Sequence, residues 1–395
     1  MWTAQVLAQR CALPTMQRVC GGPDAVADPL GRVRGHHDPK GAPMQDVAAK
    51  QGSLEHERLV IRRAARSGVT LMVAVHSTAL GPAVGGCRMR PYRCWQDGLA
   101  DVLRLSEAMS YKCAAAGLAY GGGKTVIALN EGTDPAHIDR HSVLLDVGDL
   151  VAEFDGCYST GPDIGTSAED MIVVRERTSH AFCLPESHGG SGSPAVPTAI
   201  GVLAALRAVS VHRFGTESLA GRRIVVSGLG AVGERLARSL AEQGAELKVS
   251  DVNDQKMVLA KELGAAWVEP GEAITTDTEI LVPAAVGGIL HHDVVSRLRC
   301  AAIVGPANNQ LVTDDVADSL RQRDILWAPD FVANAGGVIY ALAREVEGLG
   351  HGQAIDRVHD IGAALAEILT NADRAGRTTL ATATDLAATR LGTAL

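Results

Sequence analysis

Apolar and polar residues alternate with two different periods along the chain, which predicts an α/β protein. Residues 59–63 and 70–76 alternate with period two around a turn at 66–68, as in a β-hairpin. Apolar side chains then recur at helical spacing over residues 99–109. Residues 125–129 are β-branched and apolar, which predicts a buried strand after that helix.

The second half of the chain alternates strands with helices. Residues 222–227 and 246–250 are predicted strands, and residues 234–244 between them form an amphipathic helical pattern. Another helix is predicted over residues 198–210. Further short strands, separated by helical stretches, are predicted at residues 280–285, 301–304 and 325–328. This order predicts a doubly wound parallel sheet of the Rossmann type.

Two lysines are the first candidate catalytic groups. Lys112 precedes Lys124 by twelve residues, and three glycines stand directly before Lys124. This predicts a constrained glycine turn that feeds a buried strand, where an apolar environment lowers a lysine pKa enough for it to act as a base. A glycine-flanked surface lysine is the open alternative. A P-loop is excluded because Leu118 stands where its first glycine is required.

A second glycine cluster, GLGAVG, follows the strand predicted at 222–227 and opens a helix. Its glycines suit a tight turn, close approach to a pyrophosphate and helix–strand packing. Asp251 ends the next strand, eighteen residues after the last glycine, where a carboxylate binds a ribose 2′-hydroxyl. No arginine follows at 252–254, so NAD is predicted rather than NADP; the alternative is that Asp251 only ends the strand. The predicted cofactor-binding residues of this unit are Gly228, Leu229, Gly230, Ala231, Val232, Gly233 and Asp251.

Composition narrows the class of protein. With 395 residues, 46% of them hydrophobic, the chain can bury two cores. A net charge of −8 without long basic runs argues against nucleic acid and anionic membranes as main partners. Apolar stretches stop short of the ~18 residues needed to span a bilayer. Eight cysteines without a CxxC pair suit reduced thiols in the cytoplasm, and adjacent histidine pairs lack zinc-site spacing, so no metal is predicted.

Composition also suggests domain boundaries. Residues 1–51 are rich in Gly, Pro, Arg and Asp, which predicts a poorly ordered extension or an over-long start, without the apolar core of a signal peptide. A first α/β domain is expected at 52–183, joined by the C-terminal segment 372–395. The Rossmann domain is expected at 184–371, with a cleft between the two domains.

Several ordered blocks resemble the leucine/valine/phenylalanine branch of the amino acid dehydrogenases, in the same wider family as the glutamate dehydrogenases. The resemblance runs from about residue 56 to the C-terminus. The matching blocks are GPAVGGCRM, MSYKCAAAGLAYGGGKTVI, GPDIGTSAEDM, SGSPAVPTAIGV, GLGAVG, SDVN, PAAVGGIL, GPANNQL and APDFVANAGGVI.

The resemblance implies a reaction and roles for individual residues. Such enzymes oxidise an L-amino acid to its 2-oxo acid and ammonium, reduce NAD, and form homo-oligomers. It implies that Lys112 binds the substrate carboxylate, Lys124 activates the attacking water and Asp163 transfers protons. From the residues alone, Asp163 could equally be a helix N-cap. Further implied contacts are Val84, Gly85, Gly86, Met89, Asn309, Val338 and Ala341 for the substrate, and Asn309 and Thr198 for the cofactor.

Substrate preference is predicted from two apolar positions. Glutamate-specific relatives carry a lysine and a serine where this chain has Val84 and Ala341, so a buried distal carboxylate would lack partners. Leucine or valine is therefore expected, with a phenylalanine- or tryptophan-type substrate as the alternative because Ala341 is small. Pro306 and Ala119-Tyr120 also depart from the family pattern, and Tyr120 is bulky enough to reshape the substrate cleft.

Two other classes of protein remain open. A regulatory NAD-binding protein would keep the GLGAVG turn but would be expected to lose one of Lys112, Lys124 and Asp163, and all three are present. A 2-hydroxy acid dehydrogenase would need a catalytic histidine with a carboxylate partner, and no histidine stands in a recognisable block.

Overall fold

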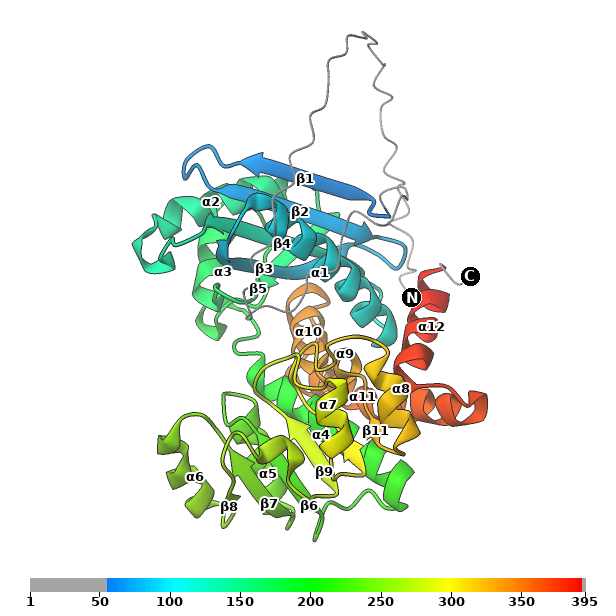
Figure 1. The fold of residues 1–395 in the computed structure, drawn as a ribbon. Coiled ribbons are helices and arrows are strands. Elements are labelled where there is room, and N and C mark those ends of the chain that lie inside the picture. Colours follow the sequence, from blue (N-terminus) through cyan, green and yellow to red (C-terminus); the bar gives the residue numbers. More distant parts are fainter. Residues whose placement is uncertain (1–54, 393–395) are drawn as a thin grey trace, which may run out of the picture. The chain divides into compact units, whose positions relative to one another are not determined.

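The computed structural model describes residues 55–392 and contains two β-sheets (Figure 1). The predicted extension at residues 1–51 lies outside the described residues. The first sheet has five strands in the order β1-β2-β4-β3-β5. Its strands are β1 (Arg58–Arg63), β2 (Thr70–Ser77), β3 (Ala83–Tyr92), β4 (Gly121–Asn130) and β5 (Tyr158–Pro162). β1 and β2 pair antiparallel, which confirms the predicted hairpin, whereas β3 runs parallel to both β4 and β5.

Helices cover both faces of this sheet. On one face, Gly98 of α1 (Trp95–Ala115) lets the helix approach the side chains of Val126 and Ala128 on β4. On the other face, α2 (Arg140–Ala152) and α3 (Ala168–Arg175) pack against the sheet around Ile127 and Leu129. Because side chains alternate along a strand, even-numbered residues of β4 face α1 and odd-numbered residues face α2 and α3.

The glycine turn predicted before Lys124 is wrong, because all three glycines already belong to β4 and none has a positive φ. They are required by close packing. A Cβ on Gly121 would lie 1.9 Å from the carbonyl O of Ser77, and one on Gly122 would lie 2.0 Å from the backbone N of Ser110 on α1. A Cβ on Gly123 would lie 2.6 Å from the ring of Tyr158. The glycines therefore let neighbouring backbone and one aromatic ring approach the strand that carries Lys124.

The second sheet is wholly parallel and has six strands in the order β11-β10-β9-β6-β7-β8, as predicted for a doubly wound fold. Alternate residues of β6 serve two cores: Ile224 and Val226 point into one, and Val225 points into the other. Its strands are β6 (Arg223–Ser227), β7 (Glu246–Ser250), β8 (Ala266–Trp267), β9 (Ile280–Pro283), β10 (Ala302–Ile303) and β11 (Leu326–Trp327).

The second half of the chain also forms the remaining helices. They are α4 (Ala195–Phe214), α5 (Gly233–Glu242), α6 (Met257–Glu262), α7 (His292–Arg297), α8 (Val316–Gln322), α9 (Asp330–Ala333), α10 (Gly336–Ala341), α11 (His351–Ala375) and α12 (Thr379–Leu391). A π-helical turn, Leu342–Val346, follows α10 directly. Arg390 of α12 donates to the carbonyl groups of Ala114 and Ala115 at the end of α1, so the C-terminal helix lies against the first half of the chain.

The expectation that apolar stretches stop short of a membrane span is wrong for α4, which is long and apolar enough to cross a membrane by length and composition alone. More than half of its apolar window is buried within the protein. Gly201 on α4 contacts Ile361 of α11 and the backbone of Gly336 on α10. These contacts identify α4 as a helix of the protein core. A core helix can match a membrane span in length and apolar composition.

Candidate active site

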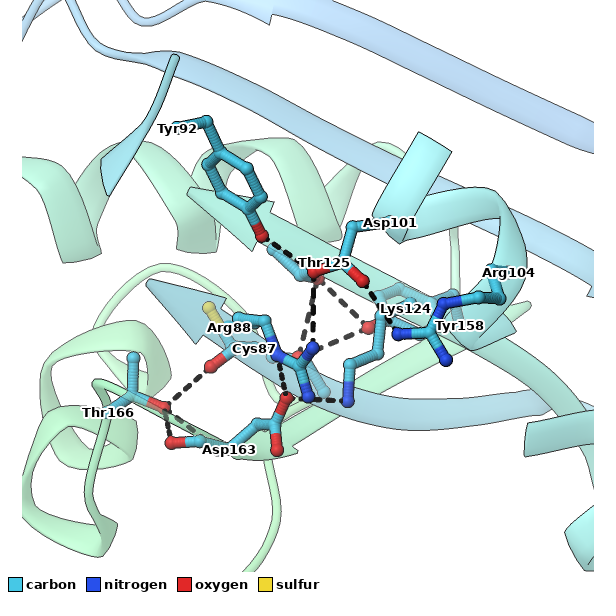
Figure 2. Close-up of polar contacts among 11 residues, drawn as sticks. Cys87, Arg88, Tyr92, Asp101, Arg104, Lys124, Thr125, Tyr158, Asp163 and Thr166 are labelled. Atoms are coloured by element: carbon cyan, nitrogen blue, oxygen red, sulfur yellow. Dashed lines mark hydrogen bonds and ion pairs between the residues drawn. The ribbon is translucent and has the colours of Figure 1, made fainter. Parts of the chain in front are cut away.

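Lys124 and Asp163 meet across the backbone of β3 (Figure 2). Lys124 lies on β4 and its Nζ is 2.8 Å from Oδ2 of Asp163, the residue that directly follows β5. Gly86 on β3 makes this contact possible, because a Cβ there would lie 2.8 Å from the Cβ of Asp163 and 3.0 Å from Nζ of Lys124. A Cβ on the adjacent Gly85 would lie 1.8 Å from the carbonyl O of Gly123, so both glycines permit close approach within the protein.

Burial sets the electrostatics of this pair. The Lys124 side chain is 7% exposed, and burial lowers the pKa of its ammonium group, although Asp163 opposes that change. Burial raises the pKa of Asp163, but the positive charges of Lys124 and Arg88 outweigh it, so the pKa of Asp163 is lowered overall. The site therefore holds an ionised carboxylate beside a lysine that loses its proton more readily than a solvated one.

Asp163 is not a helix cap. Helix α3 begins after Ser167, whose hydroxyl accepts from the backbone N–H of Asp170 in a capping box. The backbone N–H of Asp163 donates to Thr166 Oγ1 at 3.0 Å, which fixes the turn after β5. The Asp163 carboxylate instead pairs with Arg88 and Lys124, so the alternative interpretation of Asp163 as a helix cap is wrong.

Arg88, Asp101 and Tyr92 extend this group, and none of them was a sequence-predicted site residue. Arg88 donates to Asp163 Oδ2 through Nε at 2.9 Å and to Asp101 Oδ2 through Nη1 at 3.1 Å (Figure 2). Asp101 lies on α1 and also accepts from Tyr92 Oη at 2.8 Å. The period of two in a strand could have found Arg88, because it shares a face of β3 with Gly86.

Lys112 lies in the last turn of α1 and donates to Asn334 Oδ1 at 2.8 Å. Asn334 in turn donates through Nδ2 to the carbonyl O of Pro306 at 3.2 Å and to Asn308 Oδ1 at 2.9 Å. Burial lowers the pKa of Lys112, with Lys124 adding to the effect and Asp330 opposing it. Asn334 was not among the predicted site residues, and its sequence signal is its place in the NAGG segment directly after α9.

Two further predicted contact residues, Asn309 and Thr198, lie near Asn334 and α10 in the fold. Asn309 has a left-handed backbone with φ of 52° and lies beside Asn308, so it belongs to the loop that Asn334 holds. Thr198 lies on the first turn of α4, and its Oγ1 is 2.9 Å from the Cβ position of Gly337 on α10. The structure thus brings the first turns of α4 and α10 together at Thr198.

The predicted substrate-pocket residues divide into two groups. Val84 and Ala341 are buried in one core cluster, and Val338 packs against that cluster. Tyr120, one of the departures from the family pattern, is buried in the same cluster directly before β4. Met89 is not brought to this group: it is buried in a separate cluster, since it lies on the face of β3 opposite to Arg88.

The GLGAVG turn connects β6 to α5. Gly228 has φ of 107°, and a Cβ on Gly233 would lie 2.0 Å from the carbonyl O of Gly228, so both positions require glycine. Gly230 is exposed, and no atom of the described residues lies within 4 Å of its Cβ position. Asp251 accepts from the backbone N–H of Leu229 at 2.6 Å and of Asn253 at 2.8 Å, so it links the turn to the end of β7.

Within residues 55–392, no group of three His, Cys, Asp or Glu side chains is arranged to hold a metal ion. In the same range Cys87, Cys94, Cys113, Cys183 and Cys300 are free thiols.

Comparisons with known proteins agree with this architecture. Residues 60–180 match the family model described as Glu/Leu/Phe/Val dehydrogenase, dimerisation domain, and residues 248–346 match Glutamate/Leucine/Phenylalanine/Valine dehydrogenase. The chain therefore belongs to the Glu/Leu/Phe/Val dehydrogenase family, which confirms the resemblance.

Individual relatives span most of the chain. A phenylalanine dehydrogenase of Bacillus thermotolerans is 38% identical over 88% of this chain and 91% of its own length. A leucine dehydrogenase of Bacillus subtilis (strain 168) is 38% identical over 82% of this chain and 87% of its own. The crystal structure of L-tryptophan dehydrogenase from Nostoc punctiforme is similar with a TM-score of 0.75 and 33% identity, covering 86% of this chain and 97% of that one.

Proposed function

We propose that this protein is an NAD-dependent L-amino acid dehydrogenase. The proposed reaction converts an L-amino acid, NAD⁺ and water to a 2-oxo acid, ammonium, NADH and a proton, and it is reversible. The observation that carries the proposal is the buried Lys124–Asp163 pair, held across Gly86 at 2.8 Å. The family membership and the names of the relatives support the reaction class.

The two lysines have separate roles in this proposal. Lys112 binds the substrate carboxylate, a charge-assisted interaction that replaces or shares its bond to Asn334 Oδ1. Lys124 in its neutral form takes a proton from the water that attacks the substrate carbon. Asp163 exchanges protons with the amino nitrogen, and its contact with Lys124 provides a direct route between base and acid. When bound, the cofactor accepts the hydride from the α-carbon.

The GLGAVG turn fits the pyrophosphate of a dinucleotide. The Cβ position of Gly230 is open, so a phosphate can approach its backbone, and α5 begins with its N-terminus at Gly233. Thr198 and Asn309 are assigned to the nicotinamide end. The carboxylate of Asp251 favours NAD because it accepts from a ribose 2′-hydroxyl and repels a 2′-phosphate.

The proposed substrate side chain is apolar. Val84 and Ala341 offer no partner for a distal carboxylate, and an unpaired buried carboxylate would cost several kcal/mol. We assign a leucine- or valine-type substrate. A phenylalanine- or tryptophan-type substrate is the second candidate, because Ala341 leaves room and relatives named for those amino acids cover most of the chain. Hydrophobic pockets separate such side chains by only ~1–3 kcal/mol per methylene, so overlapping activity is expected.

A panel of the twenty L-amino acids and matching 2-hydroxy acids tests the proposal. With NAD⁺ in the assay, NADH absorbance should appear with apolar amino acids and not with hydroxy acids. Comparing kcat/KM across the panel identifies the substrate. Glutamate in first place would contradict the pocket assignment, and phenylalanine or tryptophan in first place would select the second candidate. Oxidation of hydroxy acids alone would overturn the reaction class.

The organisation of the protein follows the same proposal. We assign residues 52–183 with 372–395 to the substrate domain and residues 184–371 to the NAD domain, with closure over the substrate excluding water. A homo-oligomer is proposed because the family model over residues 60–180 is described as a dimerisation domain. A monomer at micromolar concentration in light scattering would contradict it. A cytoplasmic location is proposed as well, because the free thiols of Cys87, Cys94, Cys113, Cys183 and Cys300 suit a reducing compartment.

A further inference from the structure

Arg88 is the buried charge at the site to which the proposed reaction gives no role. Its side chain is 12% exposed and comes from β3, two residues after Gly86. One guanidinium group joins two carboxylates, with Nε on Asp163 Oδ2 at 2.9 Å and Nη1 on Asp101 Oδ2 at 3.1 Å. A buried arginine is costly unless its charge is balanced, and this arginine is balanced on both sides.

Asp101 is itself held firmly. Besides Arg88, its Oδ2 accepts from Tyr92 Oη at 2.8 Å and its Oδ1 accepts from Arg104 Nη2 at 2.9 Å. The carboxylate thus receives three donors from β3 and α1, as the dashed lines of Figure 2 show. Arg88 is therefore held by Asp101 through Nη1, and its Nε fixes the position of the Asp163 carboxylate.

Lys124 and Arg88 approach the same oxygen of Asp163, Oδ2. The proposed reaction needs Lys124 neutral, and a neutral amine no longer balances the carboxylate. A guanidinium cannot lose its proton at any pH at which the protein is folded. Arg88 is the cation that stays on Asp163 when Lys124 has lost its charge.

We propose that Arg88 is a positioning residue, which fixes the Asp163 carboxylate and balances its charge while Lys124 changes protonation, with Asp101 as its own counter-charge. This role rests on the proposed dehydrogenase function. Other titratable groups act on the pair electrostatically: Lys112 from α1, Cys87 from β3 and Tyr158 from β5, with Asp330 acting on Lys112. Burial raises the pKa of the Cys87 thiol and the Tyr158 phenol, so both are neutral at moderate pH.

The charges next to Lys124 and Asp163 predict the direction in which each substitution shifts their pKa values. Arg88 lowers the pKa of both Asp163 and Lys124, so its removal must raise both values. Removal of the Asp101 charge leaves Arg88 less compensated, and the same values must fall. If Arg88 and Asp101 served only to fill space, their substitutions would not shift these pKa values in opposite directions.

The test is the pH dependence of kcat/KM for an amino acid substrate. In the wild type it should rise with pH as Lys124 deprotonates, at an apparent pKa below the ordinary 10.5 of lysine. In Arg88→Gln this limb should move to higher pH by about one unit and kcat should fall, whereas in Asp101→Asn it should move to lower pH. Arg88→Lys keeps the charge but not the bridge, so it should restore the pH limb more fully than kcat.

Arg90→Gln is the matched control, since Arg90 is an exposed arginine of the same strand and its Nε donates to the carbonyl O of Pro91. Its profile should match the wild type. Shifts in the same direction for Arg88→Gln and Asp101→Asn, or no shift in either, would overturn the proposal. If Arg88→Gln does not fold, the direction of the Asp101→Asn shift decides alone.

A second readout does not depend on turnover. The Cε chemical shift of Lys124 in [¹³C]lysine-labelled protein, assigned by its loss in Lys124→Ala, reports the titration of Lys124 directly. The midpoint should move up in Arg88→Gln and down in Asp101→Asn. If these shifts occur while no amino acid is oxidised, the reaction assignment fails and the charge-balancing role of Arg88 stands. If amino acids are oxidised but the midpoints do not move, the reverse holds.

Discussion

The two glycine clusters of this chain differ in what surrounds them, and the difference lies at Gly230. Gly121, Gly122 and Gly123 lie inside β4, where added Cβ atoms would meet backbone or ring atoms at 1.9, 2.0 and 2.6 Å. In the GLGAVG turn, Gly230 is exposed and its Cβ position is open. All three glycines of the first cluster admit other parts of the protein, as do Gly228 and Gly233 of the second, whereas Gly230 leaves space for a ligand. Glycine density therefore marks close approach without saying what approaches.

The comparison separates the two regions by task. The region around β4 places Lys124 in a buried, charged environment, where burial alters its chemistry. The region around β6 and α5 presents backbone at a surface for binding the cofactor, and the cofactor itself supplies the hydride chemistry. Substitutions in the first region should thus change turnover or folding, whereas substitutions in the second should change cofactor affinity.

The largest effect is expected from Lys124→Ala. Removal of the base should lower kcat by about 100- to 10,000-fold, the range for loss of a general base. NAD binding, measured by fluorescence titration of NADH, should be unchanged because Lys124 lies on β4 and not on the GLGAVG turn. Normal turnover in this variant would refute the assignment of the base.

Next comes the pair Gly122→Ala and Gly230→Ala, which tests the comparison directly. The first places a methyl group 2.0 Å from the backbone N of Ser110 and should destabilise the fold by at least about 1–3 kcal/mol in urea unfolding. The second, with open space and no positive φ, should stay within about 0.5 kcal/mol of the wild type and weaken NADH binding instead. If Gly122→Ala and Gly230→Ala destabilised the fold equally, the difference drawn between the two glycine clusters would be wrong.

Lys112→Ala should show that binding and chemistry are divided within the first region. Loss of a charged partner for the substrate carboxylate should raise the amino acid KM by about 10- to 100-fold, with a smaller change in kcat. Asn334→Ala is the companion variant, because it removes the protein partner of Lys112 while leaving the ammonium group in place. A loss confined to kcat in Lys112→Ala would assign this lysine to the chemical step.

The smallest effect is expected at the cofactor ribose. Asp251→Asn keeps an oxygen that can accept from the backbone N–H of Leu229 but removes the charge. It should lower the preference for NAD over NADP by about tenfold, the size of one hydrogen bond to a charged group. The ratio of kcat/KM values for the two cofactors measures it. A wild type that already prefers NADP would contradict the role given to Asp251.

Local pattern predicted much of this molecule. The hairpin of β1 and β2 and the parallel strands β6, β7, β9, β10 and β11 follow from apolar periodicity, because a half-buried or fully buried strand imposes its pattern on neighbouring residues. Lys112, Lys124 and Asp163 were chosen from motif and resemblance. Two local interpretations are wrong: the glycine turn before Lys124, and the alternative of Asp163 as a helix cap.

The sequence by itself determined the class of fold, the dinucleotide turn and the lysines, since each depends on residues close together in the chain. Only the tertiary structure decided which side chains meet across long separations. Arg88 reaches Asp163 over 75 positions and Lys112 reaches Asn334 over 222. It also showed that Gly86 is the point over which Lys124 and Asp163 come together. The physical reason is that burial and charge pairing depend on distance in space, which one sequence records only where neighbours in space are also neighbours along the chain.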